Sequence, residues 1–122
     1  MLREETVRQN KGEPLRRWFA DDYFDLILWE GDEDFLQMQL CYDRSGDEHA
    51  LVWTEKKGYL HFRVDEGELG SLKKASPMMV DDGSFDGAKL RREFAARSRG
   101  LEPSVRRWVK RRLREFCGLR QE

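Results

Sequence analysis

Cys41, His49 and His61 are the residues of this 122-residue chain that could carry out covalent chemistry. A thiol near an imidazole acts as a nucleophile with its base when a third group orients the imidazole and the pKa of the thiol is lowered. Asp25 is the only nearby candidate for that third group. No turn beside Cys41 would form an oxyanion hole, and the paired spacing of zinc ligands is missing. A Cys/His enzyme is therefore our third choice, and we predict no catalytic residue, metal site or cofactor.

Residues 81–93, DDGSFDGAKLRRE, come close to the pattern of a calcium-binding loop. Two features argue against calcium: Lys89 stands at the eighth position, which is normally apolar, and the preceding segment contains Pro77 and reads as strand. We expect instead that Asp82 and Gly83 make a turn and that Ser84 or Asp86 caps a helix. The residues at calcium-loop positions one, three, five, six and twelve are Asp82, Ser84, Asp86, Gly87 and Glu93.

Four runs of alternating hydrophobicity between Tyr23 and Val64 indicate half-buried antiparallel strands. Turn signals separate them at residues 31–34, 44–46 and 56–58, and the last two end in a Gly, which a positive φ would favour. Residues 14–20 and 76–80 are candidates for two further short strands, the first at an edge of the sheet.

Beyond residue 86 the hydrophobic period becomes helical. Leu90, Phe94 and Ala95 predict a helix that ends near Gly100, and Pro103 occupies the favoured first position of a second helix. The predicted fold class is therefore α+β: an antiparallel β-meander of four to six strands with two C-terminal α-helices packed on one face. We expect residues 1–13 to be a flexible N-terminal segment and residues 14–122 to be a single domain.

The register of the four strands follows if all three turns contain an odd number of residues, because residue parity is then kept across the sheet. The even face is nearly all apolar, so we predict that it forms the core beneath the helices. Its members are Phe24, Leu26, Leu28, Leu36, Met38, Leu40, Tyr42, Ala50, Val52, Leu60, Phe62 and Val64.

The odd face would combine aromatic rings with polar side chains, which is typical of ligand pockets and partner interfaces. Our leading hypothesis is a non-catalytic binding or protein-interaction domain that uses this face for a small ligand, an unknown protein or a second copy in a homodimer. The alternative is that loops, the N-terminal segment or a helix simply cover the face. The candidate binding residues are Trp29, Gln37, Gln39, Cys41, His49, Trp53, Tyr59, His61 and Arg63.

The last helix carries a row of basic residues away from its apolar stripe. Such a row can meet phosphates, so nucleic-acid binding is our second hypothesis. The simpler interpretation is a solvated face that pairs with acidic groups elsewhere in the chain, and it leads us to expect at most weak, salt-sensitive association with nucleic acid. The candidate residues are Arg106, Arg107, Lys110, Arg111 and Arg114.

Charge is unevenly distributed along the chain although its net value is only −1. Residues 21–86 hold six Lys/Arg and seventeen Asp/Glu, whereas residues 87–122 hold twelve and four. The N-terminus has no apolar run, so we expect that it is not a signal peptide. No stretch approaches the roughly 20 apolar residues of a membrane span, and two Cys are too few for a disulfide framework. We expect a cytoplasmic protein with no membrane partner.

Four segments of the chain resemble a family of short, uncharacterised bacterial proteins. They are RRWFADDYFDLILW (16–29), QLCYD (39–43), VDEGE (64–68) and SPMMVDDGSFD (76–86). The resemblance covers nearly the whole chain and implies a bacterial origin and one compact domain. Because the family has no assigned activity, the resemblance carries over no functional residues.

Overall fold

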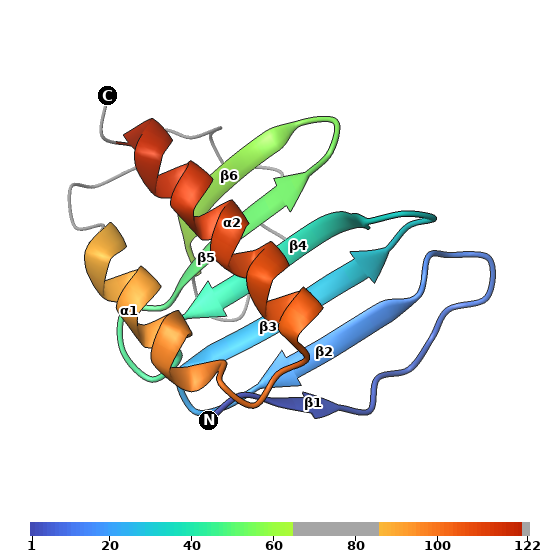
Figure 1. Ribbon diagram of the computed structural model, residues 1–122, viewed down its shortest axis with the longest axis horizontal. Coiled ribbons are helices and arrows are strands. Elements are labelled where there is room, and N and C mark those ends of the chain that lie inside the picture. Colours follow the sequence, from blue (N-terminus) through green and yellow to red (C-terminus); the bar gives the residue numbers. More distant parts are fainter. Residues whose placement is uncertain (65–85, 121–122) are drawn as a thin grey trace.

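Six antiparallel strands form one sheet in which the spatial order follows the sequence order, and two C-terminal helices cross one face of it (Figure 1). The computed structural model describes residues 1–64 and 86–120, and the predicted α+β fold is confirmed there. The strands are β1 (Arg3–Glu5), β2 (Arg16–Ala20), β3 (Phe24–Glu30), β4 (Phe35–Tyr42), β5 (His49–Thr54) and β6 (Gly58–Arg63), and the helices are α1 (Gly87–Arg97) and α2 (Pro103–Arg120).

Strand β1 was not predicted from the sequence, because its three residues are all charged. It pairs with β2, so β2 is not an edge strand. Two contacts hold it in place: Leu2 is buried in the core, and Glu4 accepts hydrogen bonds from Arg17 of β2 at 2.8 and 2.9 Å. Arg17 also forms an ion pair, at 3.5 Å, with Glu102 in the segment that connects α1 to α2.

The β3–β4 hairpin keeps the predicted parity and contains a bulge. Trp29 pairs with Gln37 and Glu30 pairs with Phe35, which leaves Leu36 as the extra residue. A Cβ on Gly31 would lie 2.6 Å from the carbonyl oxygen of Asp34, so this tight turn requires glycine.

The β4–β5 hairpin reverses the parity, and the predicted register is therefore wrong for β5 and β6. Tyr42 pairs with His49 across a loop of residues 43–48, which is an even number. Asp43, and not Gly46, takes the positive φ, at 60°. Its carboxylate accepts a hydrogen bond from the backbone N–H of Asp47, four residues further along the loop, at 3.3 Å. The β5–β6 turn restores an odd loop with Gly58 at a φ of 77°, as predicted.

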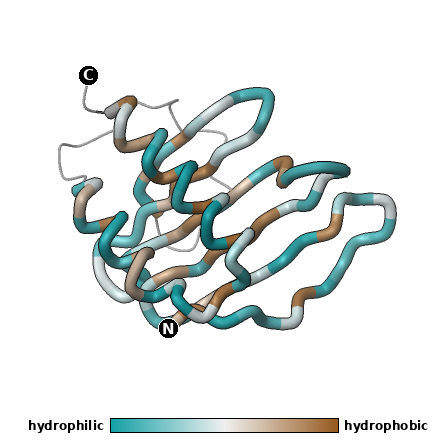
Figure 2. Tube along the Cα trace, viewed as in Figure 1, coloured by the Kyte–Doolittle hydropathy of each residue, from teal (hydrophilic) through white to brown (hydrophobic). Residues whose placement is uncertain are grey.

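The core beneath the helices consequently joins even residues of β3 and β4 to odd residues of β5 and β6. Phe24, Leu40 and Leu51 are fully buried there. The predicted core residues of β5 and β6 lie on the opposite face of the sheet: Ala50, Val52, Leu60 and Phe62. Figure 2 shows hydrophobic residues along the strands and hydrophilic ones over most of the hairpin loops.

Both helices begin as the sequence indicates. Asp86 caps α1 by accepting a hydrogen bond from the backbone N–H of Lys89 at 3.0 Å, and Pro103 opens α2. Helix α1 ends at Arg97 with Ser98 as its cap, a little before the predicted Gly100. The predicted strand at 76–80 and the calcium-pattern residues Asp82 and Ser84 lie outside the described residues.

Neither described helix combines the length and apolar character that a membrane-spanning segment requires.

Candidate functional site

The nine residues predicted to share one binding face lie on two faces of the sheet. Strands β3 and β4 place Trp29, Gln37, Gln39 and Cys41 on the face away from the helices. Because the parity reverses at the β4–β5 loop, the remaining five belong to the helix side. They are His49, Trp53, Tyr59, His61 and Arg63.

On the helix side of the sheet, three side-chain rings stack nearly parallel, and one of them contacts helix α2. Tyr42, His49 and His61 stack with interplanar angles of 13–20° and centroid distances of 5.3–6.0 Å. The hydroxyl of Tyr42 lies 2.7 Å from Nε2 of His61, and the ring of Phe116 packs on His61. Nδ1 of His49 lies 2.8 Å from the carbonyl oxygen of Asp47, so this nitrogen must carry a proton. The two histidines thus contribute to packing between sheet and helix.

Trp53 and Tyr59 also contact helix α2. The Trp53 ring packs edge-on against Trp108, and the guanidinium of Arg112 lies 5.0 Å from one ring centroid and 5.3 Å from the other. The hydroxyl of Tyr59 lies 2.6 Å from the carboxylate of Glu115. These rings therefore do not form an exposed patch.

Cys41 lies on the opposite face of the sheet from both histidines, so it does not pair with either of them. Its cross-strand partner is Ala50, and its side chain is buried. Burial, with the charges of Glu48 and Asp25, raises the pKa of Cys41 to about 12, which is opposite to what a nucleophile needs. No group of three or more His, Cys, Asp or Glu side chains within the described part of the chain is arranged to hold a metal ion.

The predicted basic residues of α2 divide into one that packs against α1 and four that face outward. Arg106 donates hydrogen bonds to Oγ of Ser98 and to the carbonyl oxygen of Ala95, both at 2.9 Å, and so ties α2 to the end of α1. The other four are exposed and recur at i, i+3, i+4 and i+7, which puts them on one stripe: Arg107, Lys110, Arg111 and Arg114.

Helix α1 adds two exposed cations to the same region, Arg91 and Arg92. With Lys110 and Arg114 of α2 they line a groove of about 410 Å³ between the helices. Neither residue was predicted from the sequence, although Arg91 and Arg92 lie four and three residues, about one helical turn, before Ala95, one of the apolar positions that predicted α1. We call the six exposed cations together the basic face: Arg91, Arg92, Arg107, Lys110, Arg111 and Arg114.

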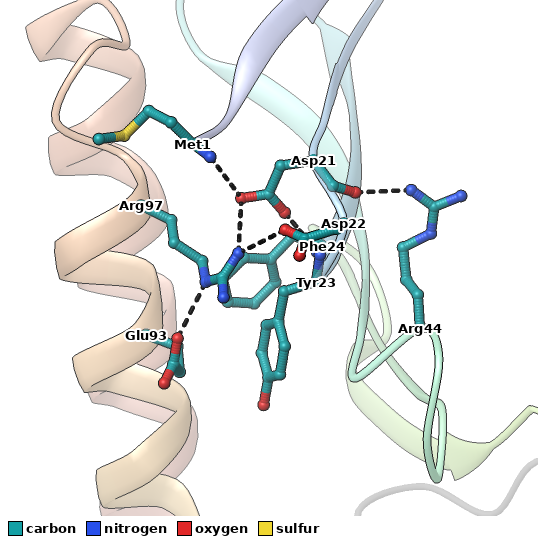
Figure 3. Close-up of polar contacts among 8 residues, drawn as sticks. All are labelled: Met1, Asp21, Asp22, Tyr23, Phe24, Arg44, Glu93 and Arg97. Carbon is teal, nitrogen blue, oxygen red and sulfur yellow. Dashed lines mark hydrogen bonds and ion pairs between the residues drawn. The ribbon is translucent and has the colours of Figure 1, made fainter.

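Arg97 of α1, unlike the basic face, forms ion pairs with acidic side chains (Figure 3). Its guanidinium donates to the carboxylates of Asp21 at 3.1 Å, Asp22 at 2.8 Å and Glu93 at 2.9 Å, and lies 4.9 Å from the Tyr23 ring centroid. The six cations of the basic face differ: within residues 1–64 and 86–120, none of them forms an ion pair or a side-chain hydrogen bond.

A hollow of about 610 Å³ lies on the face away from the helices, near the β5–β6 turn. Its apolar lining is Leu36, Val52 and Leu60, and Leu36 is 38% exposed. Elsewhere on this face Cys41 and Ala50 are buried.

Comparisons of this chain with models of protein families, with curated proteins and with solved structures found no match, which is consistent with a resemblance only to proteins that have no assigned activity.

Proposed function

We propose that this protein is a non-catalytic binding domain that holds a polyanionic partner against its basic face. The observation that carries this proposal is the set of six exposed cations on two adjacent helices with no acidic partner among the described residues. This finding reverses the order of our two leading hypotheses, because the acidic groups of the sheet do not pair with these cations in the described part of the chain.

The arrangement is unfavourable for the isolated protein. On α2, Arg107 lies three residues before Lys110 and four before Arg111. Arg114 lies four residues after Lys110 and three after Arg111. Like charges at these spacings destabilise a helix by about 0.2–0.5 kcal/mol per pair. A polyanion would relieve this repulsion, and its bound counterions would be released on association. Binding should therefore weaken as salt concentration rises.

Retention on immobilised heparin tests the proposal. We expect wild type to bind at low salt and Arg107→Glu with Arg111→Glu to elute at lower salt. The control changes Lys56→Glu and Lys57→Glu, two exposed residues of the β5–β6 turn, and has the same net charge as the helix variant. Equal loss of retention in both variants, or no retention of wild type, would contradict the proposal.

A second proposal retains Trp29, Gln37 and Gln39 in a binding role, on the face away from the helices. It is supported by the hollow beside Leu36. If this face joins two copies in a homodimer, light scattering should give twice the 14.6 kDa of the chain, and Leu36→Asp should return a monomer. A wild-type monomer would remove this second proposal.

The two free cysteines, Cys41 and Cys117, are both buried, which suits a reducing compartment, and we propose a cytoplasmic location.

A further inference from the structure

We infer that the groove between α1 and α2 is a site for the phosphodiester backbone of single-stranded nucleic acid. This inference rests on the proposed function and specifies its partner. The groove has cations on both walls, Arg91 and Arg92 on α1 and Lys110 and Arg114 on α2. A chain of phosphates lying between the helices would therefore meet positive charge on each side.

The composition of the walls favours phosphate. Three of the four cations are arginines, whose planar guanidinium donates two parallel hydrogen bonds to a phosphate or carboxylate. Phosphodiesters differ from the carboxylates of an acidic protein in carrying their charge at every unit of a continuous backbone. Two rows of cations facing one groove suit such a regularly charged strand.

The floor of the groove is made of small and apolar side chains. Ala88 and Ala95 lie on the α1 side and Leu113, which is buried, on the α2 side. Short side chains at these positions leave space between the longer basic ones, so a backbone can come close to the helices. Among the residues that the structure describes, the groove lining contains no aromatic side chain on which bases could stack. Binding should therefore depend on phosphates and show little preference for base sequence.

The small size of the groove favours one strand over two. It encloses about 410 Å³ between the side chains of two neighbouring helices. A groove of this size accommodates one phosphate backbone more readily than a duplex, whose phosphates lie on two strands separated by grooves about 6 and 12 Å wide.

The two walls are held in a fixed relation before any ligand arrives. Arg97 fastens α1 to the turn at Asp21 and Asp22 (Figure 3), and Arg106 fastens α2 to the carbonyl oxygen of Ala95. Such preorganisation lowers the entropic cost of binding.

The test measures fluorescence anisotropy of a labelled single-stranded oligonucleotide with the full chain. We expect a wild-type dissociation constant of about 10⁻⁴–10⁻⁶ M at physiological salt, as for sequence-independent binding. The four groove cations predict a slope of about −3 for log K against log salt concentration, at about −0.7 per contacted phosphate.

Two variants with the same change in net charge distinguish binding in the groove from general electrostatic attraction to the basic face. Arg91→Glu with Arg114→Glu alters the groove, and Arg107→Glu with Arg111→Glu alters exposed arginines of the basic face that do not line it. We expect the groove variant to bind the oligonucleotide about tenfold more weakly, with a salt slope smaller in magnitude by about 1.4. We expect the matched variant to bind only about threefold more weakly. Arg91→Ala with Arg114→Ala serves as a milder groove variant, and circular dichroism checks that each variant is folded.

Each other result overturns a specific part of the inference. Equal weakening by the two charge-reversal variants would show a diffuse field with no groove site, and the proposed function would stand. Competition by poly-L-glutamate as strong as by the oligonucleotide would assign an acidic polymer as the partner. Tighter binding of a duplex of the same sequence would rule out the single-strand preference. Absence of binding to the oligonucleotide and to heparin would remove both the inference and the proposed function.

Discussion

Tyr42 of β4 lies directly opposite His49 of β5, and their rings stack with centroids 5.8 Å apart and 20° between their planes. An even-numbered residue thus faces an odd-numbered one. This pairing moves every residue of β5 and β6 to the face opposite the one that uniform parity predicts. It also places His61 within hydrogen-bonding distance of Tyr42 and brings Trp53 beneath α2.

Two leucines distinguish the observed register from the predicted one. Leu51 is fully buried beneath the helices, whereas Leu60 is only partly buried on the opposite face. Leu51→Ala should lower the free energy of unfolding by about 2–5 kcal/mol, as truncation of a core leucine does, and Leu60→Ala should cost clearly less. Urea unfolding of both variants measures the difference. A larger cost at Leu60 would support the register that uniform parity predicts.

Asp21 should make stability depend on pH in the acid range. Burial alone would raise its pKa, but hydrogen bonds from the backbone N–H groups of Phe24 and Tyr23 and from Arg97 outweigh that effect and hold the pKa below its usual value. A lowered pKa contributes stability above the unfolded-state value of about 3.9 and loses it as the pH falls through the lower folded-state value. We expect Asp21→Asn to cost about 1–3 kcal/mol at pH 7, since it removes charge-assisted hydrogen bonds, and less near pH 3.

Asp22→Asn is the matched control for this experiment. Asp22 pairs with the same Arg97, but its side chain is 87% exposed, so its loss should cost under about 1 kcal/mol. Urea unfolding at the two pH values compares the variants. An Asp21→Asn cost that stays constant from pH 7 to pH 3 would show that the charge of Asp21 is not the source of its effect.

Both thiols should react slowly in the folded protein. Burial, followed by the charges of Glu48 and Asp25, raises the pKa of Cys41 to about 12, so almost no thiolate exists at neutral pH, and the side chain of Cys117 on α2 is also buried. Iodoacetamide at pH 8, followed by intact-mass spectrometry, should leave native protein largely unmodified and alkylate two cysteines in urea. Rapid native modification of Cys41 would reopen the hypothesis of a reactive thiol.

Local patterns in the sequence were sufficient to predict the α+β class, both helices and the four main strands. Alternation in 23–64 and the helical period after residue 86 are properties of neighbouring residues, and Pro103 and Asp86 occupy the helix starts that their chemistry favours. Strand β1 could not be predicted this way, because it is stabilised by partners distant in sequence, Arg17 and the core around Leu2.

The candidate site was harder to predict because it depends on one loop and on the packing of two helices. The β4–β5 loop has an even number of residues and holds Asp43 at a positive φ, a conformation that Asp adopts more often than most residues but that its type alone does not dictate. The even number of loop residues places Trp29 and Trp53 on opposite faces of the sheet. Likewise, the basic stripe of α2 was visible in the sequence, but its proximity to Arg91 and Arg92 follows only from the arrangement of α1 and α2.

The most direct test of the basic face is a nuclear magnetic resonance titration of isotope-labelled protein with a short heparin fragment, following backbone amide and arginine side-chain signals. We predict that the largest shifts fall on α1 and α2 around Arg91, Lys110 and Arg114, and that signals of Trp29 and Leu60 on the opposite face stay in place. Largest shifts on the face of Trp29 and Leu60, with the helices unaffected, would contradict the assignment of the binding surface to the helical layer.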